Sequence, residues 1–186
     1  MILGITGKIA SGKSELLKIL KAEGFYCIDA DKIVHDLYKS GGVGANKIAA
    51  YFGKQFLDSD GSVNRKKIRD EVFHNDDERK YLENLIHPEV YREIEELLSK
   101  HKGKNIAIEA VYFDNDFSDD FVDKLIWVER DENKILSALI NERSFDDKLA
   151  KKLISLIAPS TEISFVLKNN ASISDLKKLV LEALKL

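Results

Sequence analysis

The fold of this chain is decided by one stretch near its start, Gly7-Lys8-Ile9-Ala10-Ser11-Gly12-Lys13-Ser14. Its spacing, G-x-x-x-x-G-K-S, is that of a phosphate-binding loop (P-loop), which needs a strand before it and a helix after it. Residues 1–6 are a short apolar run that predicts a buried strand, and residues 14–22 carry apolar side chains at helical spacing. The required context is present, so the sequence predicts a nucleotide-binding loop.

The residue types of this P-loop explain how it would hold phosphate groups. Gly7 and Gly12 let the backbone turn tightly and approach a phosphate without a Cβ in the way. Consecutive backbone N–H groups and the N-terminus of the following helix attract an anion. Lys13 suits the β- and γ-phosphates of ATP, and the Ser14 hydroxyl can bind Mg²⁺. We expect all of residues 7–14 to contact the nucleotide. The alternative is a glycine-rich turn followed by a chance Lys-Ser pair.

Length and composition fit one compact domain. The chain has 186 residues, of which 33% are charged and 44% hydrophobic, and its net charge of −3 gives no basic excess that would indicate a nucleic-acid partner. Cys27 is the only cysteine, so no intramolecular disulfide can form. No apolar run is long enough to span a bilayer, and we expect no signal peptide and no membrane partner. We therefore expect a cytoplasmic protein, and a monomer, with an oligomer left open.

Two aspartates directly follow the second predicted strand, residues 25–28. In open α/β sheets, ligands bind outside the carboxyl ends of the strands. One carboxylate of Asp29 and Asp31 could accept the proton of an attacking hydroxyl, and the other could hold Mg²⁺ or its waters. The alternative is that Asp31 simply caps a helix over residues 32–38.

A long helical insertion follows a glycine-rich connector at residues 40–44. Asn64 predicts a helix cap, and Pro88 predicts a kink or a restart in a later helix. Arg65 and Arg69 stand at i and i+4, on one helix face, and could hold phosphate groups of a substrate. The alternative for this pair is two solvated arginines.

The rest of the chain predicts a parallel sheet, because strands alternate with helices. The expected strands are residues 105–113, 125–128 and 163–167. Two helices, ending at residues 140 and 157, are expected between the last two of these strands, and a further helix ending at residue 184 follows the last strand. Glu109 could be a Walker-B-like carboxylate or simply a polar residue at a strand end. The polar stretch around Arg143 predicts a mobile lid, which would bring an arginine to the transferring phosphoryl group.

In combination these features resemble the dephospho-CoA kinases, over essentially the whole chain. The order and spacing of the matches carry the resemblance. The matching residues are the P-loop, Asp29-Ala30-Asp31 with Ile33, Phe52-Gly53, Asp60-Gly61, Arg65 with Ile68-Arg69, Val72-Phe73, His87-Pro88, Arg143 and Asn169-Asn170. The resemblance implies an α/β P-loop kinase fold with a five-stranded parallel sheet flanked by helices. The core would comprise residues 1–39, 103–140 and 158–186, with an acceptor-binding insertion at 40–102 and a lid at 141–157.

The resemblance also implies an activity and roles for individual residues. The activity is ATP-dependent phosphorylation of the ribose 3′-hydroxyl of dephospho-CoA, the last step of coenzyme A synthesis. Asp31 would be the catalytic base, and Lys13 and Arg143 would stabilise charge on the γ-phosphoryl group. The remaining roles would be acceptor binding by Asp29, Asp31, Arg65, Arg69 and His87, adenine binding near Asn169 and Asn170, and Mg²⁺ binding by Ser14 and Asp29.

Several positions depart from the family pattern. The departures are Lys8 and Ala10 in place of glycines in the P-loop, Glu15 in place of a threonine, residues 110–114 in place of Pro-Leu-Leu-aromatic-acid, and Ala171 in place of a glycine. In addition, residues 155–163 contain neither the Gln nor the Arg expected after the lid. Two alternatives therefore stay open: a kinase for another small acceptor, such as a nucleoside monophosphate, and a nucleotide-binding regulatory protein with a degraded lid.

Overall fold

The computed structural model describes residues 1–73, 75–111, 113, 121–159 and 163–185. The chain divides into two compact units. The sheet unit comprises Met1–Ile28 and Gly103–Leu186, and the helical unit comprises Asp29–Lys102. The helical unit thus begins at Asp29, whereas the insertion predicted from the sequence begins at residue 40.

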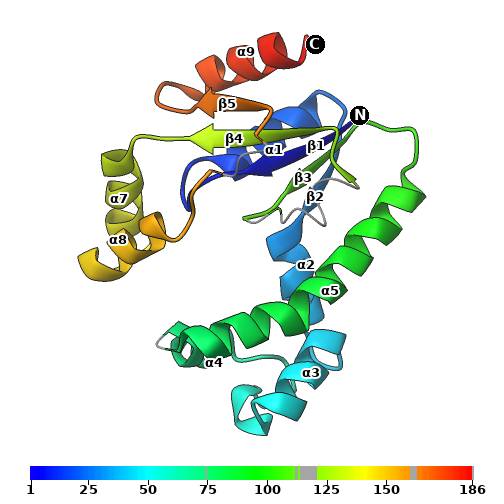
Figure 1. Ribbon diagram of the computed structural model, residues 1–186, viewed down its shortest axis with the longest axis vertical. Helices are drawn as coiled ribbons and strands as arrows, with labels where there is room; N and C mark the ends of the chain where they lie inside the picture. Colours follow the sequence, from blue (N-terminus) through cyan, green and yellow to red (C-terminus); the bar gives the residue numbers. More distant parts are fainter. Residues whose placement is uncertain (74, 112, 114–120, 160–162, 186) are drawn as a thin grey trace. The chain divides into compact units, whose positions relative to one another are not determined.

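The sheet unit is built on five strands in the order β2-β3-β1-β4-β5 (Figure 1). Strand β1 pairs in parallel with both β3 and β4, so that Gly4 lies opposite Ile108 on one side and Leu125 on the other, and β4 pairs in parallel with β5. The strands are β1 (Ile2–Thr6), β2 (Tyr26–Asp29), β3 (Ile106–Glu109), β4 (Lys124–Glu129) and β5 (Phe165–Lys168). The predicted fold class, a five-stranded parallel sheet flanked by helices, is confirmed.

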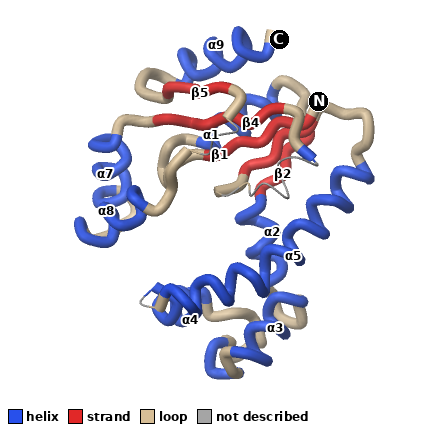
Figure 2. Tube along the Cα trace, in the orientation of Figure 1, coloured by secondary structure: helices blue, strands red, loops and turns tan. Residues whose placement is uncertain are grey.

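Among the described residues, four helices of the sheet unit connect or flank these strands (Figure 2). The last of them starts with a capping box, in which the Ser172 hydroxyl accepts a hydrogen bond from the backbone N–H of Asp175 and the Asp175 carboxylate accepts one from that of Ser172. The helices are α1 (Lys13–Ala22), α7 (Glu132–Asn141), α8 (Asp147–Ser155) and α9 (Ile173–Leu184).

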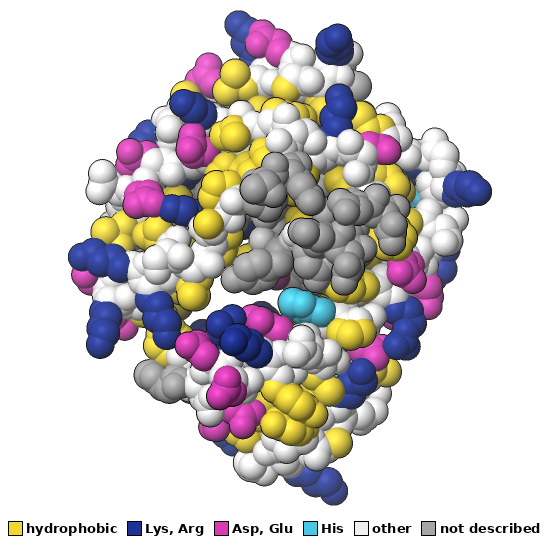
Figure 3. Space-filling model, viewed as in Figure 1, with side chains coloured by type: hydrophobic (Ala, Val, Ile, Leu, Met, Phe, Trp, Pro, Cys, Tyr) yellow, Lys and Arg dark blue, Asp and Glu magenta, His cyan; other side chains and the backbone are white. Residues whose placement is uncertain are grey.

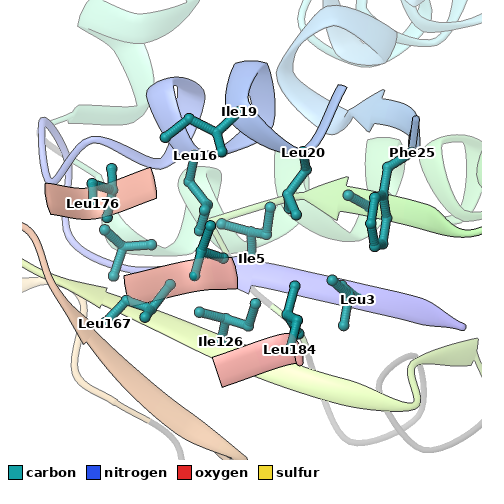
Figure 4. Packing of buried hydrophobic residues seen from close by; sticks show 13 residues of the cluster. Leu3, Ile5, Leu16, Ile19, Leu20, Phe25, Ile126, Leu167, Leu176 and Leu184 are labelled. Atoms are coloured by element: carbon teal, nitrogen blue, oxygen red, sulfur yellow. The ribbon is translucent and has the colours of Figure 1, made fainter. Parts of the chain in front are cut away.

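The main core of the sheet unit lies between the sheet and helices α1 and α9. Leu16 and Leu20 of α1, at i and i+4, are fully buried, as are Leu3 and Ile5 of β1. Figure 4 shows these side chains converging with Leu167, Leu176 and Leu184 from the last strand and the last helix. Because burying one such side chain contributes about 1.5–3 kcal/mol, this cluster fixes α1, and with it the P-loop, on the sheet.

The described part of the helical unit contains four α-helices and a short 3-10 turn, Lys54–Phe56. The predicted cap at Asn64 is confirmed, because its side chain accepts a hydrogen bond of 2.9 Å from the backbone N–H of Lys67. Asn75 caps the following helix, because its side chain accepts hydrogen bonds from the backbone N–H groups of Asp77 and Glu78. The helices are α2 (Ala30–Leu37), α3 (Val43–Tyr51), α4 (Arg65–Phe73) and α5 (Asp76–Lys100).

Helix α5 runs through Pro88 without interruption, so the predicted restart at this proline is wrong. Proline cannot donate to the carbonyl four residues earlier and disturbs that turn. In this turn the Lys47 ammonium donates to the carbonyl of Leu85 at 3.4 Å and to the Glu89 carboxylate at 2.7 Å. Glu89 is only 6% exposed and also pairs with Arg92, and the hydrogen bond from Lys47 lowers the pKa of its carboxyl group.

Some predicted bounds differ from those in the structure. The second helix begins at Ala30 rather than at residue 32, and the third strand ends at Glu109 instead of continuing to residue 113. The family departures at Tyr112 and Asp114, and part of the loop after Pro159, lie outside the described residues.

Charged side chains of both signs intermingle on the face shown in Figure 3, and its described part has no broad patch of one sign. None of the helices in the described part of the chain combines the length and the apolar character that crossing a bilayer requires.

Candidate active site

The P-loop connects strand β1 to helix α1, and its two motif glycines have the backbone geometry that favours glycine. Gly7 has φ 148° and Gly12 has φ 101°. A Cβ on Gly7 would lie 2.5 Å from the carbonyl oxygen of Val128, and one on Gly12 would lie 2.0 Å from Nδ2 of Asn169. Both positions therefore exclude a side chain on conformational and on steric grounds.

Of the two non-glycine departures inside the loop, only Ala10 has a positive φ. Its φ of 57° lies in the left-handed region, which costs roughly 1–2 kcal/mol for a residue with a Cβ; Lys8 has no such strain. Ala10 and Ile9 also pack against a small apolar cluster of helices α7 and α8, formed by Ile135, Leu139, Ala150 and Ile154. The alanine thus gains packing at a position where its backbone is strained.

Lys13 lies folded against the backbone of its own loop. Its side chain is buried, and its ammonium group donates to the carbonyl oxygens of Gly7 at 3.0 Å and Lys8 at 3.2 Å. Gly12, the N-cap of α1, has no side chain to satisfy the first backbone N–H groups of that helix. Such N–H groups, together with a lysine, form the usual binding site for phosphate at the start of a helix.

Two oxygen-bearing side chains that could bind a metal ion, those of Ser14 and Glu109, lie close together at the P-loop. The Ser14 hydroxyl donates to Oε1 of Glu109 at 3.1 Å, and Glu109, the last residue of β3, is 8% exposed. Mg²⁺ prefers oxygen ligands and is commonly held by one or two carboxylates together with phosphate oxygens, so these two residues fit the ion. No group of three or more His, Cys, Asp or Glu side chains among the described residues is arranged to hold a metal by itself.

Two side chains from neighbouring strand ends hold the P-loop backbone. Arg130, directly after β4, donates from Nη1 to the carbonyl of Ala10 at 2.9 Å. Asn169, directly after β5, donates from Nδ2 to the carbonyl of Ser11 at 2.8 Å. Asn170 accepts a hydrogen bond of 2.7 Å from the backbone N–H of the turn after β4. Sequence reasoning missed Arg130, although its place at the end of a predicted strand was a usable signal.

The predicted lid corresponds to helices α7 and α8 and the turn between them. Lys8 of the P-loop forms an ion pair with Glu132 at the start of α7. Arg143 lies exposed in the turn, and the structure gives it no hydrogen bond or ion pair with the described residues. The movement of this segment, and the role of Arg143 in it, stay predictions.

The two aspartates at the end of β2 and just beyond it have different positions. Asp29 is the N-cap of α2, and its Oδ1 accepts a hydrogen bond of 3.0 Å from the backbone N–H of Lys32. Asp31 lies in the first turn of the same helix with its side chain exposed. The alternative that Asp31 is the helix cap is therefore wrong, because Asp29 fills that role.

Within the helical unit, the structure brings two of the five predicted acceptor-binding side chains, Arg65 and Arg69, to the same hollow. Arg65 and Arg69 line one hollow of about 440 Å³, and Arg65 Nη1 also lies 3.3 Å from Nδ1 of His35. His87 is half-buried in α5, 5.9 Å from the ring of Tyr91, and does not line this hollow. The other lining residues are Tyr38, Lys66, Ile68, Val72 and Leu82, so a cationic edge adjoins an apolar floor.

Comparison with known proteins decides which family has this set of features. The dephospho-CoA kinase family model matches residues 1–175. A dephospho-CoA kinase of Fusobacterium nucleatum is 35% identical over 184 residues, covering 97% of this chain and 95% of that protein. The chain belongs to the dephospho-CoA kinase family.

Solved structures agree with this dephospho-CoA kinase assignment. A dephospho-CoA kinase from Campylobacter jejuni superposes with a TM-score of 0.62 and 25% identity, covering 99% of this chain and 95% of that one. A crystal structure of a Thermus thermophilus protein has a TM-score of 0.74 at 21% identity, covering 100% and 96%, and at that identity shows the fold alone.

Membership of the dephospho-CoA kinase family makes the chain an ATP-dependent kinase. The family, fold class and enzyme class predicted from the sequence are thereby confirmed.

Proposed function

We propose that this chain transfers the γ-phosphoryl group of ATP to the ribose 3′-hydroxyl of dephospho-CoA and releases ADP and coenzyme A. The observation that carries the proposal is the family match over residues 1–175. Its chemical support is the P-loop, whose glycine geometry, buried lysine and Ser14–Glu109 pair suit a nucleoside triphosphate.

In this proposal the P-loop binds the triphosphate through backbone N–H groups. Lys13 moves its ammonium group from the loop carbonyls to the β- and γ-phosphates, and Ser14 and Glu109 hold Mg²⁺. The bound ion would neutralise phosphate charge. Asp29 was also predicted as a Mg²⁺ ligand; its Oδ1 is used in the cap of α2, so that role falls to its Oδ2.

The acceptor is proposed to use residues of the helical unit. Asp31 accepts the proton of the 3′-hydroxyl as that oxygen forms a bond to the γ-phosphorus and the bond to the β-phosphate oxygen breaks. Arg65 and Arg69 hold the acceptor's phosphates, and the apolar floor of their hollow suits an uncharged arm. His87 is also proposed to help hold the acceptor, at a place outside this hollow.

Stabilisation of the transferring group is proposed for the α7–α8 segment. Arg143 is exposed and has side-chain freedom to reach a bound nucleotide, as lid arginines do. Asn169 and Asn170 follow β5 beside the P-loop, where they are proposed to border the adenine. We further propose that the enzyme acts as a cytoplasmic monomer; size-exclusion chromatography with light scattering tests the oligomeric state.

The decisive experiment measures ADP release from MgATP with dephospho-CoA, and with AMP, CMP or adenosine in its place. We expect release only with dephospho-CoA, with a product of the mass of coenzyme A. Release with AMP or CMP instead would favour a nucleoside monophosphate kinase. ATP binding without release for any acceptor would favour a regulatory protein whose lid has lost its catalytic residues.

A further inference from the structure

Two consecutive carbonyl groups of the P-loop are held by side chains from outside the loop. The Ala10 carbonyl accepts from Arg130 and the Ser11 carbonyl accepts from Asn169, at 2.9 and 2.8 Å. The donors directly follow β4 and β5, which are neighbours in the sheet. The two contacts therefore tie the middle of the loop to the rigid edge of the sheet.

These contacts fix the direction of the loop's N–H groups. The carbonyl and the N–H of one planar trans peptide point in opposite directions. With the Ser11 carbonyl turned toward Asn169, the N–H of Gly12 in the same peptide turns to the opposite side, at the N-cap of α1. The N–H of Ser11, in the peptide whose carbonyl Arg130 holds, closes the loop's turn by donating to Lys8 at 3.2 Å.

The Arg130 contact lies at the one strained residue of the loop. Ala10 has φ 57°, a conformation that a glycine adopts without strain and an alanine does not. Residues in such conformations persist when the surrounding structure holds them there. Arg130 supplies this restraint, because a planar, permanently charged guanidinium donates to the carbonyl of the strained residue itself.

We propose that Arg130 is a positioning residue for nucleotide binding: it holds the P-loop in its binding conformation through the Ala10 carbonyl. Asn169 does the same for the next peptide. Arg130 thereby allows an alanine, whose methyl group packs on the α7–α8 cluster, at a place where the loop conformation suits glycine. This proposal rests on the proposed function, since it concerns the site that binds ATP.

A double-mutant cycle between Arg130→Met and Ala10→Gly tests the proposal. The dissociation constant of MgATP is measured by calorimetry, and KM is measured for ATP and for dephospho-CoA. We expect Arg130→Met to weaken ATP binding about tenfold, which is about 1.4 kcal/mol, and to leave the KM for dephospho-CoA unchanged. In the Ala10→Gly background the same substitution should cost about threefold or less, because glycine needs no restraint there.

Lys177→Met is the matched control. Lys177 lies on α9 of the same unit, and its ammonium group forms an ion pair of 2.7 Å with Glu23 at the end of α1. This variant removes a positive charge from the sheet unit and leaves the Ala10 contact intact. We expect its ATP affinity to stay within about twofold of the wild type. An equal loss in both single variants would mean that only net charge matters, and would overturn the proposal.

The other outcomes are equally informative. An undiminished tenfold loss from Arg130→Met in the Ala10→Gly background would show that Arg130 acts independently of Ala10, for example by touching the nucleotide, and would overturn the proposal. If Arg130→Met does not fold, as judged by circular dichroism, the cycle is repeated with Arg130→Lys. A wild-type protein that fails to bind MgATP would instead refute the proposed function, whereas wild-type binding without coupling would refute only the role of Arg130.

Discussion

Ser14 and Glu109 are joined by a hydrogen bond of 3.1 Å between Oγ and Oε1, which connects the start of helix α1 to the end of strand β3. Glu109 is a buried carboxylate, and a charge in that environment needs compensation from hydrogen bonds, cations or metal ions. A hydroxyl and a carboxylate also form a set of oxygen ligands that suits Mg²⁺. In the proposed function, this pair is therefore the part of the site that would hold the metal.

Replacing Glu109 by Gln should weaken the use of Mg²⁺. The amide keeps the shape of the side chain and removes its charge, so the Mg²⁺ concentration that gives half-maximal activity should rise at least tenfold, with kcat/KM about a hundredfold lower at fixed Mg²⁺. Glu129→Gln, an exposed residue at the end of strand β4, which β1 separates from β3, is the control and should change neither value. Equal Mg²⁺ dependence in Glu109→Gln and wild type would remove Glu109 from the metal site.

We expect Lys13 to be essential for turnover, unlike a surface lysine of the same helix. Its replacement by Met removes the donor to the Gly7 and Lys8 carbonyls and the cation for the phosphates, so kcat should fall by at least a hundredfold. Lys18→Met, on the same helix and paired only at the surface with Glu15, should keep full activity. Steady-state assays of both proteins check this; retained activity in Lys13→Met would contradict the phosphate-binding role.

Much of the fold could be predicted because the decisive signals are local. The P-loop spacing, the apolar run before it and the i, i+4 leucines after it identify β1 and α1 from the sequence alone. The capacity of Asn64 to cap a helix is local as well. Strand order is not local: that β1 lies between β3 and β4 depends on packing between segments more than a hundred residues apart. The start of α2 was placed two residues late because both Asp29 and Asp31 are good caps.

The site residues that belong to a local motif could be predicted from the sequence. The contacts between residues far apart in the chain could not. Lys13 and Ser14 follow from the motif. The partnership of Ser14 with Glu109 and the contact of Arg130 with Ala10 join residues far apart in sequence, so no spacing rule reveals them. The strain at Ala10 was partly foreseeable, since the family pattern has a glycine there, but the same argument applied to Lys8 and the structure shows no strain at that position.

Asp31→Asn tests the proposed general base. Because Asp29 and not Asp31 caps α2, this substitution leaves the cap intact, and kcat should fall by about 10²–10⁴ while the affinity for MgATP stays unchanged. Asp36→Asn, an exposed aspartate later in the same helix that pairs with Lys39, is the control and should retain wild-type kcat. Full turnover in Asp31→Asn would exclude Asp31 as the base.

We expect Asp29 to stabilise the protein by capping α2, in addition to its proposed role in the site. Asp29→Ala removes the acceptor for the Lys32 N–H and should lower the free energy of unfolding by about 1 kcal/mol, whereas Asp29→Asn, which can also cap, should lose much less. Urea unfolding of the two variants measures the difference. Equal stability of the Ala and Asn variants would show that the cap contributes nothing measurable.

We expect the ion pair between Lys47 and Glu89 to make a pH-dependent contribution to the free energy of unfolding. The hydrogen bond from Lys47 lowers the pKa of the Glu89 carboxyl below its unfolded value of about 4.3, so this stabilisation is present above that pH and is lost as the pH falls through the lower folded pKa. Lys47→Met leaves a buried carboxylate with Arg92 as its remaining ion-pair partner among the described residues. Because the Lys47 side chain is 36% exposed, we expect a loss of about 1–3 kcal/mol at pH 7 rather than the larger cost of a fully buried pair.

The same variant separates the charge of Lys47 from its second contact, the Leu85 carbonyl beside Pro88. As the pH is lowered from 7 to 3, toward the lowered folded pKa of Glu89, the difference in unfolding free energy between wild type and Lys47→Met should shrink, because the wild type alone loses the ion pair. Lys100→Met, which breaks an exposed pair with Glu96, should change stability by no more than about 0.5 kcal/mol at either pH. A Lys47→Met difference that is equally large at pH 7 and pH 3 would assign its effect to the Leu85 carbonyl and to packing around Pro88, and not to Glu89.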